Sequence, residues 1–423
     1  MAGKNGYLRK VKVQPAQYDI LVIGGGAAGF FGAVNAASFA PGKKIAIIEK
    51  SGKILAKVLV SGGGRCNVTH ACFDNKELVK NYPRGEKELL GPFSKFSTSD
   101  TIEWFSQRGV DLKVEEDGRM FPETDDSQTI ADCLLTEAEE NNVEIIRNTE
   151  IVSFEKTSSG WKLRSKNSEE FHCKKLLIAH GGSPKLSSYD HLARLGHSII
   201  PPLPSLFTFN MPGNKIISLM GVSVEHAIVK IKGTSIETNG PLLITHWGMS
   251  GPAILKASSF GAREIGKYNY QFKAIVSWNG NDDVESVADE IESFRKNEGA
   301  QSVFSNAKFG LPKRLWQFIV TRCGISDETN WADLNKIHLE KLSISIAADE
   351  YAVNGKTTFK EEFVTCGGIS LREVDFRTMQ STIMKDLFFA GEVLDIDAVT
   401  GGFNFQAAWT TGWLAAKGMT ANE

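Results

Sequence analysis

Residues 61–67, Ser-Gly-Gly-Gly-Arg-Cys-Asn, place a cation, a thiol and an amide directly after a run of glycine. Glycine lets a backbone turn sharply or approach a ligand closely. Arg65 supplies five donors in a planar fork, and Asn67 both donates and accepts hydrogen bonds. The pattern indicates either a tight turn beside a surface cation or a loop pressed against a large, flat, partly charged ligand.

Gly24, Gly26 and Gly29 form a G-x-G-x-x-G motif between a short apolar run, 20–23, and a stretch of small apolar residues, 27–40. The first glycine permits the turn, the second admits a pyrophosphate, and the third lets helix and strand pack closely. Free N–H groups at the helix start would face the phosphates. The motif predicts a dinucleotide site, and the alternative is a glycine-rich turn in an unrelated α/β domain.

An acidic residue follows at the spacing that this kind of site uses. Glu49 ends a second apolar run, 44–48, about 20 residues after Gly29. A carboxylate there accepts hydrogen bonds from ribose hydroxyls and would repel a 2′-phosphate. The sequence therefore argues against NADP at this site.

A second strand, loop and helix lies near the C-terminus. Residues 387–391 read as a buried strand followed by Glu392, and residues 400–409 carry two glycines before a helical tail. The chain also returns to the sheet at 175–179, before His180-Gly181-Gly182. A simple NAD enzyme needs one glycine cradle, whereas a flavoprotein needs one for the pyrophosphate and one for the ring. A helix start at the flavin edge would stabilise the reduced ring.

Composition limits the function classes. The 423 residues are 42% apolar and 23% charged, with 48 Lys and Arg against 50 Asp and Glu. This balance predicts a globular protein of two or three domains without a nucleic-acid partner. Six cysteines without a C-x-x-C pair predict a reducing, cytoplasmic location and no metal site. We expect neither a membrane span nor a secretory signal, and the oligomeric state stays unknown.

The predicted fold class is α/β: a discontinuous Rossmann-like FAD-binding domain with an inserted β-barrel and a small helical module. Residues 201–204, Pro-Pro-Leu-Pro, mark the first boundary, and Asn354-Gly355 marks the second. Strand character is expected again at 342–347. The predicted domains are a flexible N-terminal segment (1–17), the first FAD-binding segment (18–200), the first β-barrel segment (201–280), the helical module (281–336), the β-barrel return (337–354) and the second FAD-binding segment (355–423).

Five segments together resemble one family. They are Gly24–Gly29 with Glu49, Ser61–Asn67, Thr245–Pro252, Thr365–Gly368, and Phe389–Asp395 continuing through Gly401–Gln406. Their order and spacing are similar to those of the HI0933-like flavoproteins, also called BaiN-like or aminoacetone oxidase-like, on a glutathione-reductase-type FAD fold. The chain departs from the family pattern at His180, where a hydroxyl residue is usual, and at Ala398, where glycine is usual.

The resemblance implies tightly bound FAD and oxidoreductase chemistry on a small molecule such as an enone or aminoketone. Because no second complete G-x-G-x-x-G unit follows, we expect either an oxidase or a reductase that binds NAD(P)H transiently. The predicted cofactor-binding residues are Gly24, Gly26, Ala28, Gly29, Glu49, Lys50, Gly62, Gly63, Arg65, Cys66, Asn67, Ile151, Gly181, Gly182, Gly391, Glu392, Asp397, Gly401, Gly402, Asn404 and Gln406.

Two residues are candidates for catalysis. His246 could line the roof over the flavin and donate a proton, and Cys66 could relay electrons with Cys72 as in disulfide reductases. The alternatives are a turn with a packed aromatic at His246 and a small buried hydrophobe at Cys66. A disulfide reductase that uses Cys66 and Cys72 is thus one alternative function. An RNA-binding or RNA-modifying flavoprotein is another.

Overall fold

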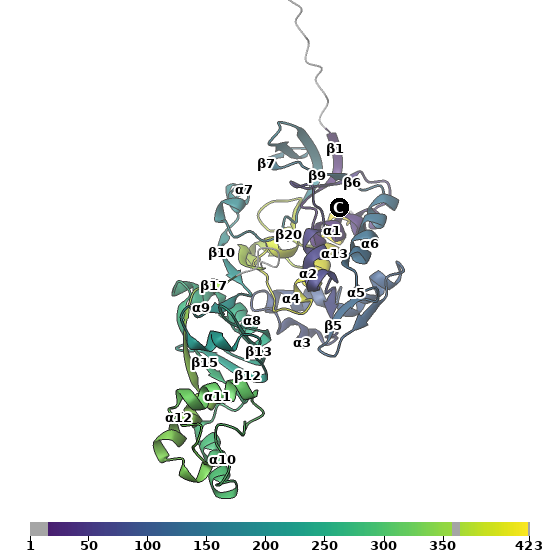
Figure 1. Cartoon of the computed structure of the whole chain (residues 1–423). Coiled ribbons are helices and arrows are strands. Elements are labelled where there is room, and N and C mark those ends of the chain that lie inside the picture. The colour runs from purple at the N-terminus through teal and green to yellow at the C-terminus, as the bar shows by residue number, and fades with distance from the viewer. Residues whose placement is uncertain (1–15, 358–363, 422–423) are drawn as a thin grey trace, which may run out of the picture.

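A computed structural model describes residues 16–357 and 364–421 of the chain. The molecule is elongated: N- and C-terminal segments together form one unit, an inserted sheet follows, and three helices lie at the far end (Figure 1). The predicted flexible segment 1–17 lies outside the described residues except for Ala16 and Gln17, which begin strand β1. Among the described residues, no helix combines the length and apolar character that crossing a bilayer requires.

A parallel sheet forms the core of the first unit, in the order β21-β9-β1-β2-β6. Its strands read as continuous apolar runs, and all four residues of β2 are buried, as expected for a parallel sheet covered on both faces. Two short antiparallel strands extend the β21 edge. The strands are β1 (Ala16–Ile23), β2 (Ile45–Ile48), β6 (Glu144–Ile146), β9 (Glu170–Ile178), β19 (Val374–Asp375), β20 (Gln380–Ser381) and β21 (Leu387–Phe389).

Small residues let the first and last helices of this unit pack closely. A Cβ on Gly412 of α13 would lie 2.8 Å from the carbonyl oxygen of Ala28 in α1, so the two backbones touch there. This contact packs the first helix of the chain against the last one. The Rossmann-like unit is therefore built from an N-terminal and a C-terminal segment. The helices of the unit are α1 (Ala27–Phe39), α2 (Ala56–Gly64), α3 (Asn75–Val79), α4 (Glu86–Phe93), α5 (Thr98–Ser106), α6 (Ser127–Glu140), α7 (Asp190–Arg194) and α13 (Phe403–Thr420).

Antiparallel strands complete the first unit. β7 (Ile151–Thr157) and β8 (Gly160–Ser165) form a hairpin that continues onto β9. A small sheet joins β3 (Thr69–His70), β5 (Arg119–Pro122) and β4 (Leu112–Val114). This small sheet fixes the segment that follows the glycine run.

Two connecting strands carry the chain into the insert and back: β10 (Ile199–Ser205) pairs with β18 (Val364–Ile369). The prolines expected to break the chain lie inside β10, where the register shifts between Ile200 and Leu203. Beyond them, an antiparallel sheet runs in the order β16-β15-β12-β13-β14-β11-β17. Its strands are β11 (Thr208–Asn210), β12 (Ser223–Ile231), β13 (Glu237–Thr245), β14 (Gly248–Ser250), β15 (Gln271–Ser277), β16 (Asp349–Asn354) and β17 (Lys356–Thr357).

Helices surround this sheet, and one of them corrects a prediction. Residues 342–347, expected to be a strand, form the end of helix α12 (Lys336–Ala347). The alternating pattern suggested a strand, but Leu342 and Ile346 lie four positions apart and bury one face of the helix. The strand that returns is β16. The other helices of the insert are α8 (Pro252–Phe260), α9 (Ala262–Lys267), α10 (Val284–Asn297) and α11 (Lys313–Arg322).

Candidate cofactor site

Four predicted motifs follow four adjacent strands of the parallel sheet. Gly24 follows β1, Glu49 follows β2, His180-Gly181 follows β9, and Gly391 follows β21. Because parallel strands end at the same edge of a sheet, these segments, which are far apart in the sequence, lie along one edge. This is the edge where open α/β sheets bind their ligands.

The first glycine turn fulfils three separate requirements. Gly24 has φ +114°, and a Cβ on it would lie 2.5 Å from the carbonyl oxygen of Ala179. A Cβ on Gly29 would lie 2.0 Å from the carbonyl oxygen of Gly24. At Gly26, by contrast, a Cβ would meet nothing within 4 Å. The open space therefore lies at the start of α1, where no side chain caps the helix and its N–H groups can receive an anion.

Glu49 is held beside this turn by two backbone donors. Its Oε2 accepts from the N–H of Gly25 at 2.9 Å, and its Oε1 accepts from the N–H of Ser51 at 2.9 Å. A carboxylate oxygen has a second lone pair, so both oxygens can still accept bonds from hydroxyl groups. The position agrees with the predicted role at a ribose.

A cavity of about 510 Å³ opens next to Glu49. The Nε2 atoms of His180 and His191 are buried and have no hydrogen-bond partner among the described residues. Burial lowers the pKa of both histidines, that of His191 to about 4, so both rings are neutral near pH 7. Unpartnered buried nitrogens need an explanation, and a polar ligand in the cavity provides one. The predicted residues among those lining the cavity are Gly24, Glu49, Lys50, Ile151 and Gly182.

His191 was not recognised as a candidate from the sequence. It lies in α7, and its ring centroid is 5.6 Å from that of His180. No motif marks this position, since only the fold brings α7 beside the end of β9.

The glycine run bends away from the helix that precedes it. α2 loses helical geometry at Ser61, and both Gly62 and Gly63 have positive φ, +59° and +70°. A Cβ on Gly62 would lie 2.8 Å from the ring of Phe121, whereas a Cβ on Gly63 would meet nothing within 4 Å. The run therefore offers open backbone at Gly63, as the prediction of close ligand approach requires.

The side chain of Arg65 points elsewhere. Its Nη1 lies 2.6 Å from Oε1 of Glu115, and its guanidinium carbon lies 3.9 Å from the centre of the Phe121 ring. The hydrogen bonds of the guanidinium to Glu115 and Asp125 both use Nη1, and the contact with a cofactor proposed from the sequence remains a prediction.

Cys66 is fully buried and has φ +62°. Burial raises the pKa of its thiol to about 12, so the reactive thiolate is scarce near pH 7. Cys66 and Cys72 are both free thiols in the structure. These properties favour the interpretation of Cys66 as a packing residue.

Asn67 joins the glycine run to the second cradle. With its amide oriented to satisfy its neighbours, its oxygen accepts from the N–H of Gly402 at 3.0 Å. Gly401 and Gly402 have φ +122° and +94°, and a Cβ on Gly402 would lie 2.4 Å from the carbonyl oxygen of Thr69. We call Gly401–Gly402, at the start of α13, the glycine lip.

Other predicted residues support the second cradle through bonds within the protein. Asn404 accepts from the N–H of Ala398 at 2.9 Å and donates to its carbonyl at 3.2 Å. The amide oxygen of Gln406 accepts from Thr69 Oγ1 at 2.6 Å. These amide side chains position the cradle, and direct cofactor contact by either one stays a prediction.

Gly391, Glu392 and Ala28 lie where the second cradle meets α1. The N–H of Gly391 donates to Thr411 Oγ1 at 2.9 Å, and a Cβ on Gly391 would lie 2.8 Å from Cβ of Ala28. The carboxylate of Glu392 pairs with Lys57 Nζ at 2.5 Å. The C-terminal strand end is therefore packed directly against the start of α1.

Asp397 is buried in an ion pair with Arg84 and accepts from Ser205 Oγ at 2.6 Å. Burial raises the pKa of Asp397 to about 6, although the Arg84 guanidinium lowers it. Arg84 also donates to the carbonyl of Ser259 in α8. This carboxylate thus joins the insert to the first unit, and its predicted cofactor contact is not supported by these bonds.

His246 lies outside this arrangement. It is exposed on the turn between β13 and β14, and its ring packs against Trp247 with centroids 4.1 Å apart. The contacts described for the chain do not join it to either glycine cradle. Its catalytic role stays a prediction.

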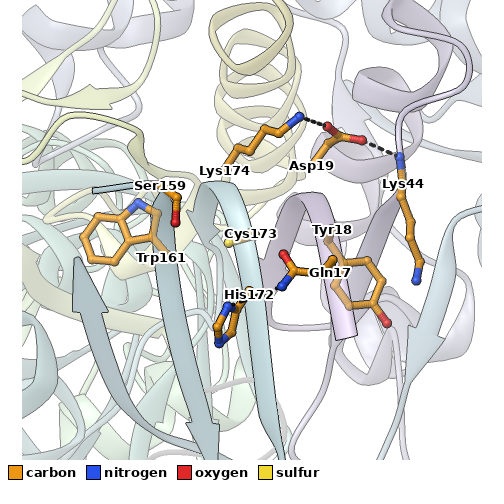
Figure 2. A pocket seen from close by; sticks show the side chains of 9 residues that line it. All are labelled: Gln17, Tyr18, Asp19, Lys44, Ser159, Trp161, His172, Cys173 and Lys174. Atoms are coloured by element: carbon orange, nitrogen blue, oxygen red, sulfur yellow. Dashed lines mark hydrogen bonds and ion pairs between the residues drawn. The ribbon is translucent and has the colours of Figure 1, made fainter. Parts of the chain in front are cut away.

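A second cavity, of about 330 Å³, lies at the opposite, amino ends of β1 and β9 (Figure 2). There Asp19 lies between Lys174 Nζ, at 2.8 Å, and the backbone N–H of Lys44, at 3.0 Å. Tyr18 donates to Glu144 at 2.8 Å. Asp19, Lys174 and Tyr18 of this cavity therefore already have partners within the protein.

The carboxyl-end site fits FAD on the structural observations alone. It offers an open helix start for a diphosphate, a fixed carboxylate for hydroxyls, and a cavity with unpartnered nitrogens for an adenosine. The second glycine cradle, at Gly402, is bonded to the glycine run 61–67 through Asn67. An extended cofactor with two different ends matches this layout better than a mononucleotide does.

Comparisons with known proteins agree with this assignment. The family model described as HI0933-like protein Rossmann domain matches residues 18–418. The ribosomal RNA dihydrouridine synthase of Escherichia coli (strain K12) is 30% identical over 96% of this chain and 98% of its own length. The 3-dehydro-bile acid delta(4,6)-reductase of Clostridium scindens is 24% identical over 94% of this chain and 97% of its own length.

A solved structure supports the fold as well. The 3-ketosteroid-delta4-(5alpha)-dehydrogenase of Rhodococcus jostii RHA1 matches with a TM-score of 0.52 and 13% identity, over 98% of this chain and 99% of that chain. At this identity the likeness concerns the fold. The family match over residues 18–418 shows that the chain belongs to the HI0933-like family of FAD-binding oxidoreductases.

Proposed function

We propose that the protein reduces a carbon–carbon double bond conjugated to a carbonyl group. The supporting observation is that two relatives of nearly full length carry names that describe this chemistry. Formation of dihydrouridine saturates a ring double bond conjugated to a carbonyl, and a delta(4,6)-reductase acting on a 3-dehydro-bile acid does the same. Different substrates therefore share one reacting group.

Bound FAD supplies the hydride for such a reaction. The residues of this chain would hold it: the start of α1 at Gly26 would receive the diphosphate, and Glu49 would accept from the ribose hydroxyls. His180 and His191 would meet the adenosine end, and the glycine lip would meet the ring. The open backbone at Gly63 would allow close approach of the cofactor. Holding the ring in one place would orient a flat substrate and lower the entropic cost of reaction.

For the substrate, we rank a uridine in ribosomal RNA first and a steroid-like enone second. The order follows the identities, 30% against 24%. The net charge of −2 gave the opposite expectation, that nucleic acid is not a partner. Because phosphate contacts make RNA binding strongly salt-dependent, a binding measurement across salt concentrations separates the two cases.

The decisive experiment is a two-step anaerobic assay on the yellow holoenzyme. NADH or NADPH is added first, and bleaching of the flavin absorption identifies the donor. An unmodified ribosomal RNA transcript or a 4-ene-3-keto steroid is then added to the reduced enzyme. We expect re-oxidation by one of these, with formation of the saturated product. Re-oxidation by oxygen alone would instead favour an oxidase.

The disulfide reductase remains an alternative with a simple test. If Cys66 and Cys72 relay electrons, a Cys72→Ser variant loses disulfide turnover completely. The burial of Cys66 and the pKa of its thiol disfavour this function.

A further inference from the structure

His70 lies against the glycine lip. It is the last residue of β3, and its Nδ1 lies 3.0 Å from the carbonyl oxygen of Gly401. Because a carbonyl only accepts, Nδ1 carries the hydrogen and donates it. The imidazole ring also stacks on Phe403, the first residue of α13, with centroids 4.5 Å apart and planes 27° apart.

The residues before His70 also bind α13. The carbonyl of Val68 accepts from Trp409 Nε1 at 2.9 Å, and Thr69 donates to Gln406 at 2.6 Å. Asn67 accepts from the N–H of Gly402. Segment 67–70 therefore clamps the first turns of the last helix, with Asn67 bonded to Gly402 and His70 to Gly401 of the lip.

The other side of the ring is confined as well. A Cβ on Gly118 would lie 2.6 Å from Nε2 of His70, so the turn between β4 and β5 closes over the imidazole. Burial lowers the pKa of His70, and the charged groups that face it are Asp117, Arg119 and Lys256 of α8. Burial therefore favours the neutral imidazole, and the carbonyl of Gly401 favours the tautomer with its proton on Nδ1.

We propose that His70 is a positioning residue for the flavin ring. Two consecutive glycines at positive φ have many accessible conformations, so a donor on the Gly401 carbonyl selects one of them. No described side chain caps the start of α13, so its first N–H groups remain available to a ligand beside the lip. The inference rests on the proposed placement of FAD.

The test uses variants that separate the hydrogen bond from the ring. His70→Asn keeps a donor for Gly401, whereas His70→Phe keeps the stack on Phe403 and loses the donor. Apoprotein of each is titrated with FAD while the visible flavin spectrum is recorded. We expect His70→Phe to bind FAD about tenfold more weakly, with absorption bands moved toward those of free FAD, and His70→Asn to stay within about threefold of the wild type.

A matched control is His172→Phe, at the amino-end cavity, which should bind FAD as the wild type does. Equal weakening in His70→Phe and His70→Asn, or no change in either, would overturn the inference. If His70→Phe does not fold, His70→Ala replaces it, because it removes the donor without adding bulk. Wild-type apoprotein that fails to bind FAD would refute the proposed function itself, which is a separate outcome.

Discussion

The two cavities at opposite ends of β1 and β9 differ in whether their polar groups already have partners. At the amino ends, Asp19, Lys174 and Tyr18 are bonded to neighbouring protein groups. At the carboxyl ends, the Nε2 atoms of His180 and His191 are buried, and no group in the described part of the chain bonds to them. Buried polar groups without partners are rare in folded proteins, and a ligand in the cavity at the carboxyl ends would supply partners for these two nitrogens.

The backbone shows the same difference. The carboxyl-end turn brings glycine into a positive φ at Gly24 and leaves open space at Gly26. The amino ends are ordinary strand. The carboxyl-end turn therefore holds a backbone conformation that only glycine adopts easily, whereas the amino ends do not. Substitutions at each end, followed by measurement of unfolding free energy and FAD affinity, test this difference.

The largest effect is expected for Gly29→Ala. The new Cβ would lie 2.0 Å from the carbonyl oxygen of Gly24, and backbone cannot yield as a side-chain tip can. We expect a loss of about 3 kcal/mol in unfolding free energy, measured by urea denaturation of the apoprotein, and a colourless product. The control is Gly91→Ala in α4, where a Cβ meets nothing within 4 Å and stability should not fall. Equal losses in both variants would contradict the assignment of the turn.

Gly26→Val is expected to affect the ligand rather than the fold. A side chain here enters open space, so the apoprotein should unfold within about 1 kcal/mol of the wild type. The same side chain occupies the position of the diphosphate, and FAD should bind about 100-fold more weakly, or about 2.8 kcal/mol. Titration of apoprotein with FAD measures this. Unchanged affinity would show that the open space is not the diphosphate site.

Local chemistry explains which regions of this site were predictable from sequence. Gly29 approaches the carbonyl of Gly24 within one strand, turn and helix, so spacing alone indicates this contact, whereas the approach of Gly24 to Ala179 comes from the fold. The partners of Arg65 cannot be predicted from spacing. Glu115 and Phe121 lie about fifty positions away or more, and only the fold shows that they contact the guanidinium.

The residues that were missed depend on long-range packing. His70 meets Gly401, and His191 meets His180 across separate elements, and neither carries a motif. The error at 342–347 has a different cause, since a short apolar pattern with small polar residues satisfies both periods and only burial of Leu342 with Ile346 decides for the helix.

A pH effect should distinguish the carboxyl-end cavity. An unfolded histidine has a pKa of about 6.5, whereas burial lowers that of His191 to about 4. Between these values the unfolded chain binds more protons, so stability is lost as the pH falls from about 6.5 to about 4, by up to about 3 kcal/mol. His191→Gln should reduce the slope of this region of the pH profile in urea denaturation, while His180 and His70, whose pKa values burial also lowers, keep part of it. An unchanged slope would mean that the ring is not held neutral.

The smallest effect is expected at the amino ends, where Asp19→Asn removes the carboxylate charge from exposed ion pairs. Such pairs contribute less than about 1 kcal/mol, so unfolding free energy and FAD affinity should both stay near the wild-type values.

The matched change at the other end is Glu49→Gln, which replaces one of the oxygens now held by Gly25 and Ser51 with a donor. We expect FAD to bind about tenfold more weakly to that variant. If Asp19→Asn weakened FAD binding as much as Glu49→Gln, the cofactor site would not be confined to the carboxyl ends of the strands, because the substitution furthest from the glycine turns would act on the ligand as strongly as the nearest one.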